Sequence, residues 1–187
     1  MSTSATSRPS AARPARSCHS RPASKRRPPV LLPLIAVLAV TDTPAVHPGE
    51  LPTTAYVQDD RNAGATPFGG QRLWAAFHGQ AGVDRIVDTL VDRNLRDPRI
   101  GDIFKGQDMV RVRRTLKEQF CYILGGGCSY TGRTMKDAHK DLGLQQADFN
   151  ALVENLQAAM RAERVSFAAQ NAFLSKLATM ERAVVVR

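Results

Sequence analysis

The sequence lacks any apolar run long enough to cross a membrane as a helix. Its longest such run, residues 30–40, has eleven residues, and at a rise of about 1.5 Å each they fall short of the roughly 30 Å of a bilayer core. The chain also lacks internal repeats and the alternating apolar pattern of strands. Together with an apolar share of 43%, these absences exclude a multi-span membrane protein and a wholly disordered chain.

Acidic residues are scarce, with 17 Asp and Glu against 26 Lys and Arg and a formal net charge of +9. The imbalance is uneven, because residues 1–29 hold seven basic residues and no acidic one, whereas residues 71–187 hold 18 bases and 13 acids. A surface that binds nucleic acid would need its basic excess on the folded part, with aromatic residues among the bases. The sequence therefore predicts no nucleic-acid partner, and a nucleic-acid-binding module stays a minor alternative.

Residues 1–45 have the pattern of a secretory signal sequence. The basic stretch Lys25-Arg26-Arg27 precedes the apolar residues 30–40, and a short polar segment ending at Ala45 follows. We expect export, with a periplasmic protein whose leader engages the membrane or the export machinery. The alternatives are an organelle-import leader and a cytoplasmic protein with a disordered basic extension. Residues 46–70 carry prolines and glycines without an apolar period, so we expect a flexible linker there.

Residues 71–187 predict an all-α domain of four main helices. The first helical pattern ends at Asp97-Pro98, where proline restricts the residue before it. The second covers residues 108–124, begins at an aspartate that can cap it, and is stopped by three glycines. The third covers about 148–160 and the fourth about 166–183. Each pattern places its apolar residues on one face.

One histidine lies among apolar residues of the folded part. His19 and His47 fall in the leader and the linker, and His78 falls in a predicted turn, whereas His139 follows Met135-Lys136-Asp137-Ala138. A single histidine is commonly structural, but an imidazole that faces a pocket can also bind haem iron, as the proximal histidine of a globin does. The spacing alone leaves both interpretations open.

Several short motifs surround His139 in a specific order. They are Asp97-Pro98-Arg99-Ile100, Ile103-Phe104, Leu124-Gly125-Gly126, Tyr130-Thr131-Gly132-Arg133, Leu142-Gly143-Leu144 and Phe149. Taken in this order, they resemble the truncated haemoglobins of group I, which are small globins built as a two-over-two helical sandwich. The similarity spans residues 73–186, which is the whole of the predicted folded part.

The resemblance implies a haem b cofactor whose iron is bound by His139 as the proximal ligand. Phe104 would stack on the haem face at the corner before the second helix. The resemblance implies further lining residues: Tyr130, Met135 and Phe149 on the proximal side, and Val91, Val112, Leu116 and Phe120 on the distal side. Three arginines are candidates to pair with haem propionates: Arg113, Arg114 and Arg133. The alternative for the apolar residues is that they belong only to the core.

The distal positions depart from the family pattern. Well-known members place tyrosine where this chain has Val91, and often glutamine where it has Val112 or Leu116, and those polar groups donate hydrogen bonds to bound oxygen. Valine and leucine have no side-chain donor, so retention of oxygen would be weaker by roughly ten- to a hundredfold. Three polar residues of the same helix would substitute if that helix were rotated: Thr115, Gln119 and Tyr122.

Two other positions bear on the assignment to group I. His78 stands where the family often has the first glycine of a pair, so only Gly79 remains and the first turn is expected to differ. Trp74 is the only tryptophan, and the absence of one after His139 argues against the other truncated-globin groups.

Cys121 and Cys128 flank the glycine turn after the second helix. A disulfide between them is geometrically possible, and in an exported protein it would hold the loop that leads to His139. The alternative is a pair of reduced thiols.

The resemblance implies a globin that binds a diatomic gas reversibly, whether oxygen, nitric oxide or carbon monoxide. A haem-based oxidoreductase, such as a nitric oxide dioxygenase or a peroxidase-like enzyme, is the alternative, but the apolar distal side offers no general acid or base. We therefore expect a gas carrier rather than an enzyme, and the redox partner and oligomeric state stay open. A helical binding module without haem is a further alternative.

Overall fold

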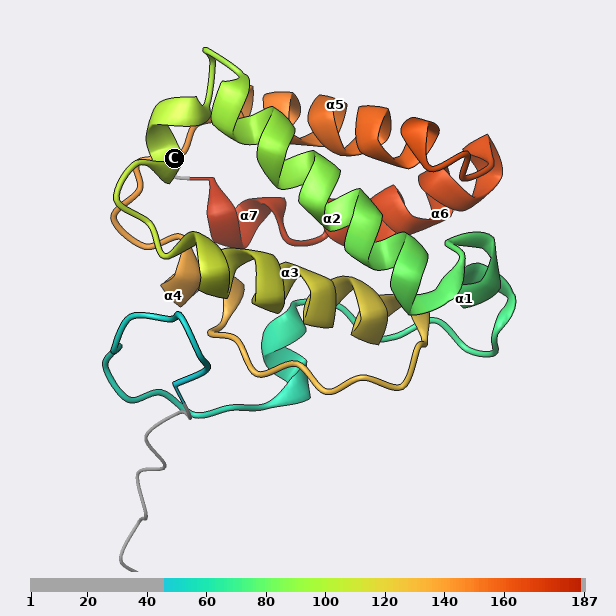
Figure 1. Ribbon diagram of the computed structural model, residues 1–187, viewed down its shortest axis with the longest axis horizontal. Coiled ribbons are helices and arrows are strands. Elements are labelled where there is room, and N and C mark those ends of the chain that lie inside the picture. Colours follow the sequence, from blue (N-terminus) through green and yellow to red (C-terminus); the bar gives the residue numbers. More distant parts are fainter. Residues whose placement is uncertain (1–45, 186–187) are drawn as a thin grey trace, which may run out of the picture. The chain divides into compact units, whose positions relative to one another are not determined.

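The computed structural model describes residues 46–185, and the predicted leader of residues 1–45 lies outside this range. Four long helices carry the fold: α2 (Gly79–Arg96), α3 (Met109–Leu124), α5 (Gln146–Ala162) and α6 (Phe167–Ala178). Short helices join them: η1 (Asp60–Ala63), α1 (Arg72–Ala76), η2 (Gly101–Phe104), α4 (Met135–Ala138) and α7 (Glu181–Val184). No strand occurs within residues 46–185, which confirms the all-α prediction (Figure 1).

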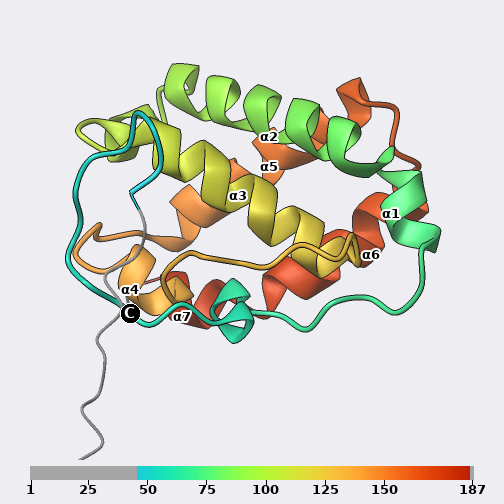
Figure 2. The ribbon, with the colours of Figure 1, turned by 60° about the horizontal axis from the view of Figure 1, so that its bottom comes forward.

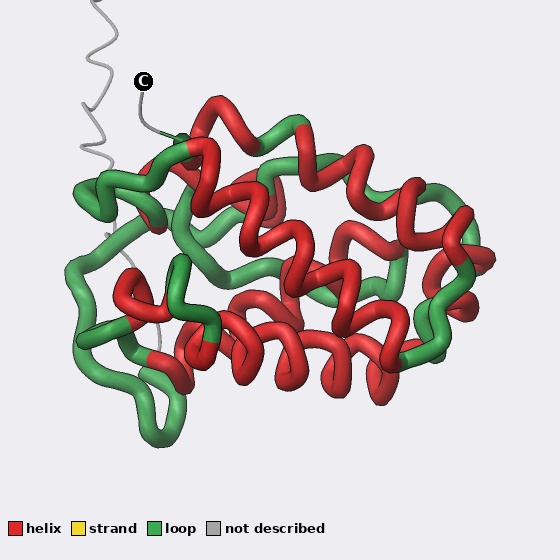
Figure 3. Tube along the Cα trace, turned by 90° about the horizontal axis from the view of Figure 1, so that it is seen from above, coloured by secondary structure: helices red, strands yellow, loops and turns green. Residues whose placement is uncertain are grey.

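Helix α2 is the element against which α3 and α5 pack. It packs on α3 along one side and on α5 along the other, and Figure 2 shows α2 crossing over α3 with α5 behind it. Loops connect the helices throughout, as the view from above in Figure 3 shows. Across the described chain, no helix has both the length and the apolar character needed to span a membrane.

The core is formed by the apolar faces that the helical periodicity predicts. Val83, Ile86, Val87 and Leu90 of α2 are buried. Three aromatic rings link α6 to α3 and to the end of α1. The ring of Phe173 in α6 lies edge-on at 5.2 Å from Phe77 and at 4.8 Å from Phe120 in α3. Such edge-to-face pairs add to the stability that burial of the rings already supplies. The core therefore fixes α3 against α6.

Most predicted helix ends agree with the structure. The Asp108 carboxylate accepts the backbone N–H of Arg111 at 3.0 Å and caps α3, and Gly125 ends it with a φ of 82°. Helix α5 begins two residues earlier than predicted, because Gln145 and Asp148 form a capping box around its first turn. The fourth predicted helix is interrupted at Thr179 and Met180, whose backbone N–H groups bond three residues back and tighten the last turn of α6.

His78 adopts a left-handed backbone conformation, which glycine enters more readily than other residues. Its φ is 60° and its ψ is 31°, in the left-handed region that glycine enters without steric cost. The next residue, Gly79, has a φ of 63°. The His78 imidazole Nδ1 lies 2.9 Å from a carboxylate oxygen of Glu163 at the end of α5. The first turn thus has left-handed geometry at both residues, and the imidazole makes a contact that glycine could not make.

The prediction of a flexible linker over residues 46–70 is corrected by the structure. This segment belongs to the same compact unit as the helices, and its residues Glu50 and Ala63 are buried. The linker prediction rested on the absence of an apolar period in this segment. It is held on the domain mainly by hydrogen bonds and ion pairs, which leave no such signature in a sequence.

The ion pairs of Glu163 predict a specific loss of stability in acid. The Arg85 guanidinium donates to the Glu163 carboxylate at 2.9 Å and lowers the pKa of that carboxyl from 4.5 to about 2. Because the unfolded chain then takes up the proton first, the free energy of unfolding falls as the pH drops from 4.5 towards about 2. Measured by urea unfolding between pH 6 and pH 3, the free energy of unfolding should depend less on pH in Glu163→Gln than in the parent. Equal slopes in parent and variant would contradict this account.

Candidate functional site

A cavity of about 250 Å³ lies among the helices, and most of its wall is apolar. Residues of all four long helices, α2, α3, α5 and α6, line it, and η2 and the loop before α4 close it. Eight of the nine predicted site residues line this cavity: Phe104, Val112, Leu116, Phe120, Tyr130, Met135, His139 and Phe149. Residues separated by up to 45 positions in the sequence are thus brought to one site.

The ninth predicted residue, Val91, does not line the cavity. It is fully buried in the core, and its neighbour Leu90 supplies the wall from α2 instead. Consecutive residues of a helix point about 100° apart, so an apolar stripe two residues wide cannot tell which member faces the cavity. Leu90 thus takes the position predicted for Val91, and both side chains are apolar. Helix α2 therefore contributes no hydrogen-bond donor to the wall.

The half-buried imidazole of His139 is positioned by the short helix before it. Thr134 caps α4, accepting the backbone N–H of Asp137 at 3.1 Å. His139 Nδ1 lies 2.7 Å from the backbone carbonyl oxygen of Met135, which can only accept, so Nδ1 carries the proton. Burial lowers the pKa of His139, although the bond to Met135 opposes this effect. At pH 7 the ring is therefore mainly neutral, and its Nε2 lone pair can bind a metal.

Two of the polar residues considered as distal donors line the cavity, but their donor groups are already used. The Thr115 hydroxyl donates to the Arg111 carbonyl oxygen at 2.9 Å. The buried Gln119 amide donates to the carbonyl oxygen of Ala63 at 2.8 Å. The third candidate, Tyr122, does not line the cavity. The donors of Thr115 and Gln119 are therefore bound to backbone carbonyl oxygens rather than directed into the cavity.

The Tyr130 ring closes the cavity beside the loop that leads to α4. Its hydroxyl donates to the Arg133 carbonyl oxygen at 3.2 Å, and burial raises the pKa of the phenol. A side chain at Gly132 would collide with the Tyr130 ring. This close approach is the physical reason for a glycine in the motif Tyr130-Thr131-Gly132-Arg133.

Sequence reasoning missed the part of the wall that comes from the C-terminal helices. Leu177, Met180 and Val184 line the cavity from α6 and α7. Leu177 and Met180 lie on a predicted apolar face, so the sequence assigns them to the core without distinguishing core from cavity. That distinction depends on how α6 ends and α7 begins, which the periodicity did not predict.

None of the three arginines considered for propionate binding lines the cavity. The structure pairs each of them elsewhere: Arg113 with Asp88 and Asp92, Arg114 with Glu50 and Glu118, and Arg133 with Thr53 and Thr54.

Cys121 and Cys128 form a disulfide, with their Cα atoms 5.7 Å apart. Cys121 is fully buried in the last turn of α3. The bond joins that turn to the loop that leads on to Tyr130 and α4. A side chain at Gly126 would lie 2.7 Å from the Cys121 sulfur and 2.8 Å from the Trp74 ring. The glycine turn is thus enclosed between the disulfide and the tryptophan.

Comparison with known proteins agrees with this architecture. A family model described as bacterial-like globin matches residues 72–186. A group 1 truncated haemoglobin from Nostoc commune is 33% identical over 113 residues, which are 60% of this chain and 96% of the relative. One from Synechocystis sp. is 37% identical over 93 residues, which are 48% of this chain and 75% of the relative.

Solved structures agree with the sequence relatives. The truncated haemoglobin of Tetrahymena pyriformis, in its Fe(III) form, has a TM-score of 0.59 at 25% identity and covers 62% of this chain and 98% of its own. The 2/2 haemoglobin of Synechococcus sp., solved in the cyanomet state with covalently attached haem, has a TM-score of 0.57 at 28% identity, with the same coverage. The chain belongs to the bacterial-like globin family, as a group 1 truncated haemoglobin.

Membership of a globin family implies haem iron, and the residues of the cavity fit that group. The wall is apolar, as a porphyrin requires, and one neutral imidazole is available as an iron ligand. Within the described residues, no group of three or more His, Cys, Asp or Glu side chains could hold a bare metal ion. The donor set is therefore suited to a metal that brings its own macrocycle.

The Gln119–Ala63 hydrogen bond predicts a measurable contribution to stability. Replacing Gln119 by leucine leaves the Ala63 carbonyl oxygen without this donor, and such a loss costs about 1–3 kcal/mol of unfolding free energy. Gln107 also lines the cavity but is exposed, so Gln107→Leu is a matched control with little expected effect. Urea unfolding of both variants measures the difference, and equal losses would contradict the prediction.

Proposed function

We propose that this truncated globin holds haem b in the cavity, with His139 as the proximal ligand, and binds a diatomic gas reversibly. The observation that carries the proposal is the state of the His139 ring. Its Nδ1 is bound to the Met135 carbonyl oxygen, its pKa is lowered by burial, and the ring lines an apolar cavity. When bound, haem would supply the iron that takes up the gas, while Nε2 of His139 would hold the iron and the apolar wall would exclude water.

The distal wall supports a carrier with fast oxygen release rather than an enzyme. Val112 and Leu116 have no donor, and the Thr115 hydroxyl is bonded to its own helix. Nitric oxide and carbon monoxide depend less on such donors than oxygen does. An oxidoreductase is the alternative, but the distal wall offers no group that could exchange protons with a substrate.

Export remains a prediction. The Cys121–Cys128 disulfide supports it, because such bonds persist mainly in oxidising compartments. The leader from which the prediction comes lies outside the described residues.

Removing the proposed ligand should abolish histidine coordination. We expect His139→Ala to lose the ferrous and carbon monoxide spectra of a histidine-ligated haem, and added imidazole to restore them in part. His78→Ala is the control, because His78 is exposed and does not line the cavity. Absorption spectroscopy of the purified proteins decides the matter, and an unchanged ferrous spectrum in His139→Ala would refute the assignment.

Adding a donor to the distal wall should slow oxygen release. In Leu116→Gln a carboxamide could bond to the bound gas, and a hydrogen bond to a charged group corresponds to roughly a ten- to hundredfold slower dissociation. Leu116→Met keeps the wall apolar and serves as the control. Stopped-flow measurement of oxygen dissociation tests this, and a parent protein already as slow as Leu116→Gln would show that a donor is present.

A further inference from the structure

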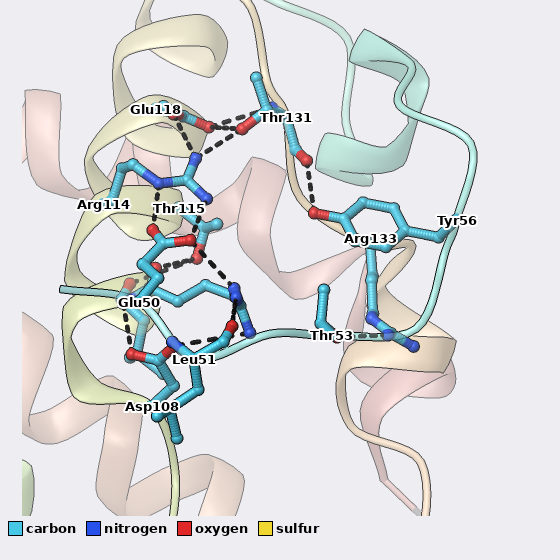
Figure 4. Close-up of polar contacts among 12 residues, drawn as sticks. Glu50, Leu51, Thr53, Tyr56, Asp108, Arg114, Thr115, Glu118, Thr131 and Arg133 are labelled. Carbon is cyan, nitrogen blue, oxygen red and sulfur yellow. Dashed lines mark hydrogen bonds and ion pairs between the residues drawn. The ribbon is translucent and has the colours of Figure 1, made fainter. Parts of the chain in front are cut away.

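Residues 47–63, here called the strap, run along the outside of two walls of the cavity. The strap contacts α3 near its N-terminal end and then the loop of residues 128–134, which leads to α4 (Figure 4). It has one short helix, η1, and otherwise no regular secondary structure. Its contacts are therefore made by side chains and by single backbone groups.

The attachment of the strap to α3 centres on a buried carboxylate. The Glu50 side chain is 1% exposed and lies between two arginines of α3, accepting from Arg111 at 3.2 Å and from Arg114 at 2.5 Å. Burial alone would raise the pKa of Glu50, but the two arginines outweigh it and hold the pKa below its usual value. The Leu51 N–H also donates at 2.8 Å to Asp108, the cap of α3. Removing the Glu50 carboxylate would therefore leave Arg111 and Arg114 without their shared negative partner.

The attachment of the strap to the loop uses a different set of groups. The Tyr56 hydroxyl donates to the Thr131 carbonyl oxygen at 2.9 Å. The Arg133 guanidinium donates to the Thr53 hydroxyl at 2.8 Å and lies 4.9 Å from the centre of the Tyr56 ring. Further along, the Asp60 carboxylate accepts the Tyr130 N–H at 2.7 Å. Three residues of the loop, Tyr130, Thr131 and Arg133, are therefore bound to the strap.

The two attachments are joined by a direct bridge between α3 and the loop. The Arg114 guanidinium, which binds Glu50, also donates to the Thr131 hydroxyl at 2.5 Å. The Glu118 carboxylate accepts the Thr131 N–H at 3.0 Å and the Thr131 hydroxyl at 2.7 Å. Strap, helix and loop form a closed ring of contacts, so releasing one member weakens the hold on the other two.

The ring of contacts surrounds elements that line the cavity. Helix α3 supplies Val112, Leu116 and Phe120, and the loop supplies Tyr130 and leads to Met135 and His139. At its end, the strap contacts the cavity wall itself, through the Ala63 carbonyl oxygen and the Gln119 amide. The strap therefore spans one wall on the distal side and one on the proximal side.

We propose that the strap holds α3 and the 128–134 loop at a fixed separation, with Glu50 as its main positioning residue, and thereby limits how readily the cavity opens to admit or release haem. The part that concerns haem rests on the proposed function; the part that concerns the separation of α3 and the loop does not.

The test compares two variants that lose the same kind of charge. Glu50→Gln removes the carboxylate between Arg111 and Arg114, whereas Glu163→Gln removes a little-exposed carboxylate paired with Arg85 and His78, outside the strap. In the full-length protein without haem, we expect Glu50→Gln to speed amide hydrogen exchange in residues 128–134 by about tenfold or more and to leave α6 unchanged. Glu163→Gln should leave residues 128–134 as in the parent.

A second readout follows haem itself. Haem loss to an excess of an acceptor apoprotein should be faster in Glu50→Gln by a similar factor, and Glu50→Asp, which keeps the charge, should restore part of the difference. If Glu50→Gln does not fold, Tyr56→Phe removes only the bond to Thr131 and should still speed exchange in the loop a few-fold.

Exchange in residues 128–134 that is equal in Glu50→Gln and Glu163→Gln would overturn the proposal, and so would an increase spread evenly over all helices. A parent protein that takes up no haem would instead overturn the proposed function, and the exchange measurement would still decide the role of the strap.

Discussion

The position of α3 is the constraint on which the rest of the site depends. The inner face of this helix supplies Val112, Leu116 and Phe120 to the cavity, and its outer face presents Arg111 and Arg114 to the buried carboxylate of the strap. At its C-terminal end, the disulfide joins it to the loop that leads to His139. A shift of α3 would therefore disturb three things together: the apolar wall of the cavity, the ion pairs with Glu50 and the position of the loop that leads to His139.

The chemistry of the cavity follows from which polar groups are already used. His139 has its Nδ1 proton bound to Met135, so only Nε2 is available. On the opposite wall, the donors of Thr115 and Gln119 are bound to backbone carbonyl oxygens. These backbone hydrogen bonds leave Nε2 of His139 without a partner in a cavity whose wall is mostly apolar. That asymmetry is what the proposed function rests on.

Much of the fold could be read from local patterns, and eight of the nine site residues that the family resemblance implied line the cavity. Apolar residues at helical spacing predicted the long helices, and Asp108 and Gly125 predicted both ends of α3. The motifs around Phe104 and His139 predicted which residues would meet, through their resemblance to a family. Leu90 lines the cavity and Val91 does not, and an apolar stripe by itself does not say which of two adjacent residues reaches a cavity.

By itself, the sequence determined the long helices and the caps of α3, because these depend on residues a few positions apart. The tertiary structure alone decided the role of residues 47–63 and the partners of Arg114 and Arg133. Glu50 and Arg114 are 64 positions apart, and an isolated carboxylate in a segment rich in proline and glycine carries no sign of its partner. Ion pairs have no periodicity, so they become visible only once the apolar faces have brought the chain together.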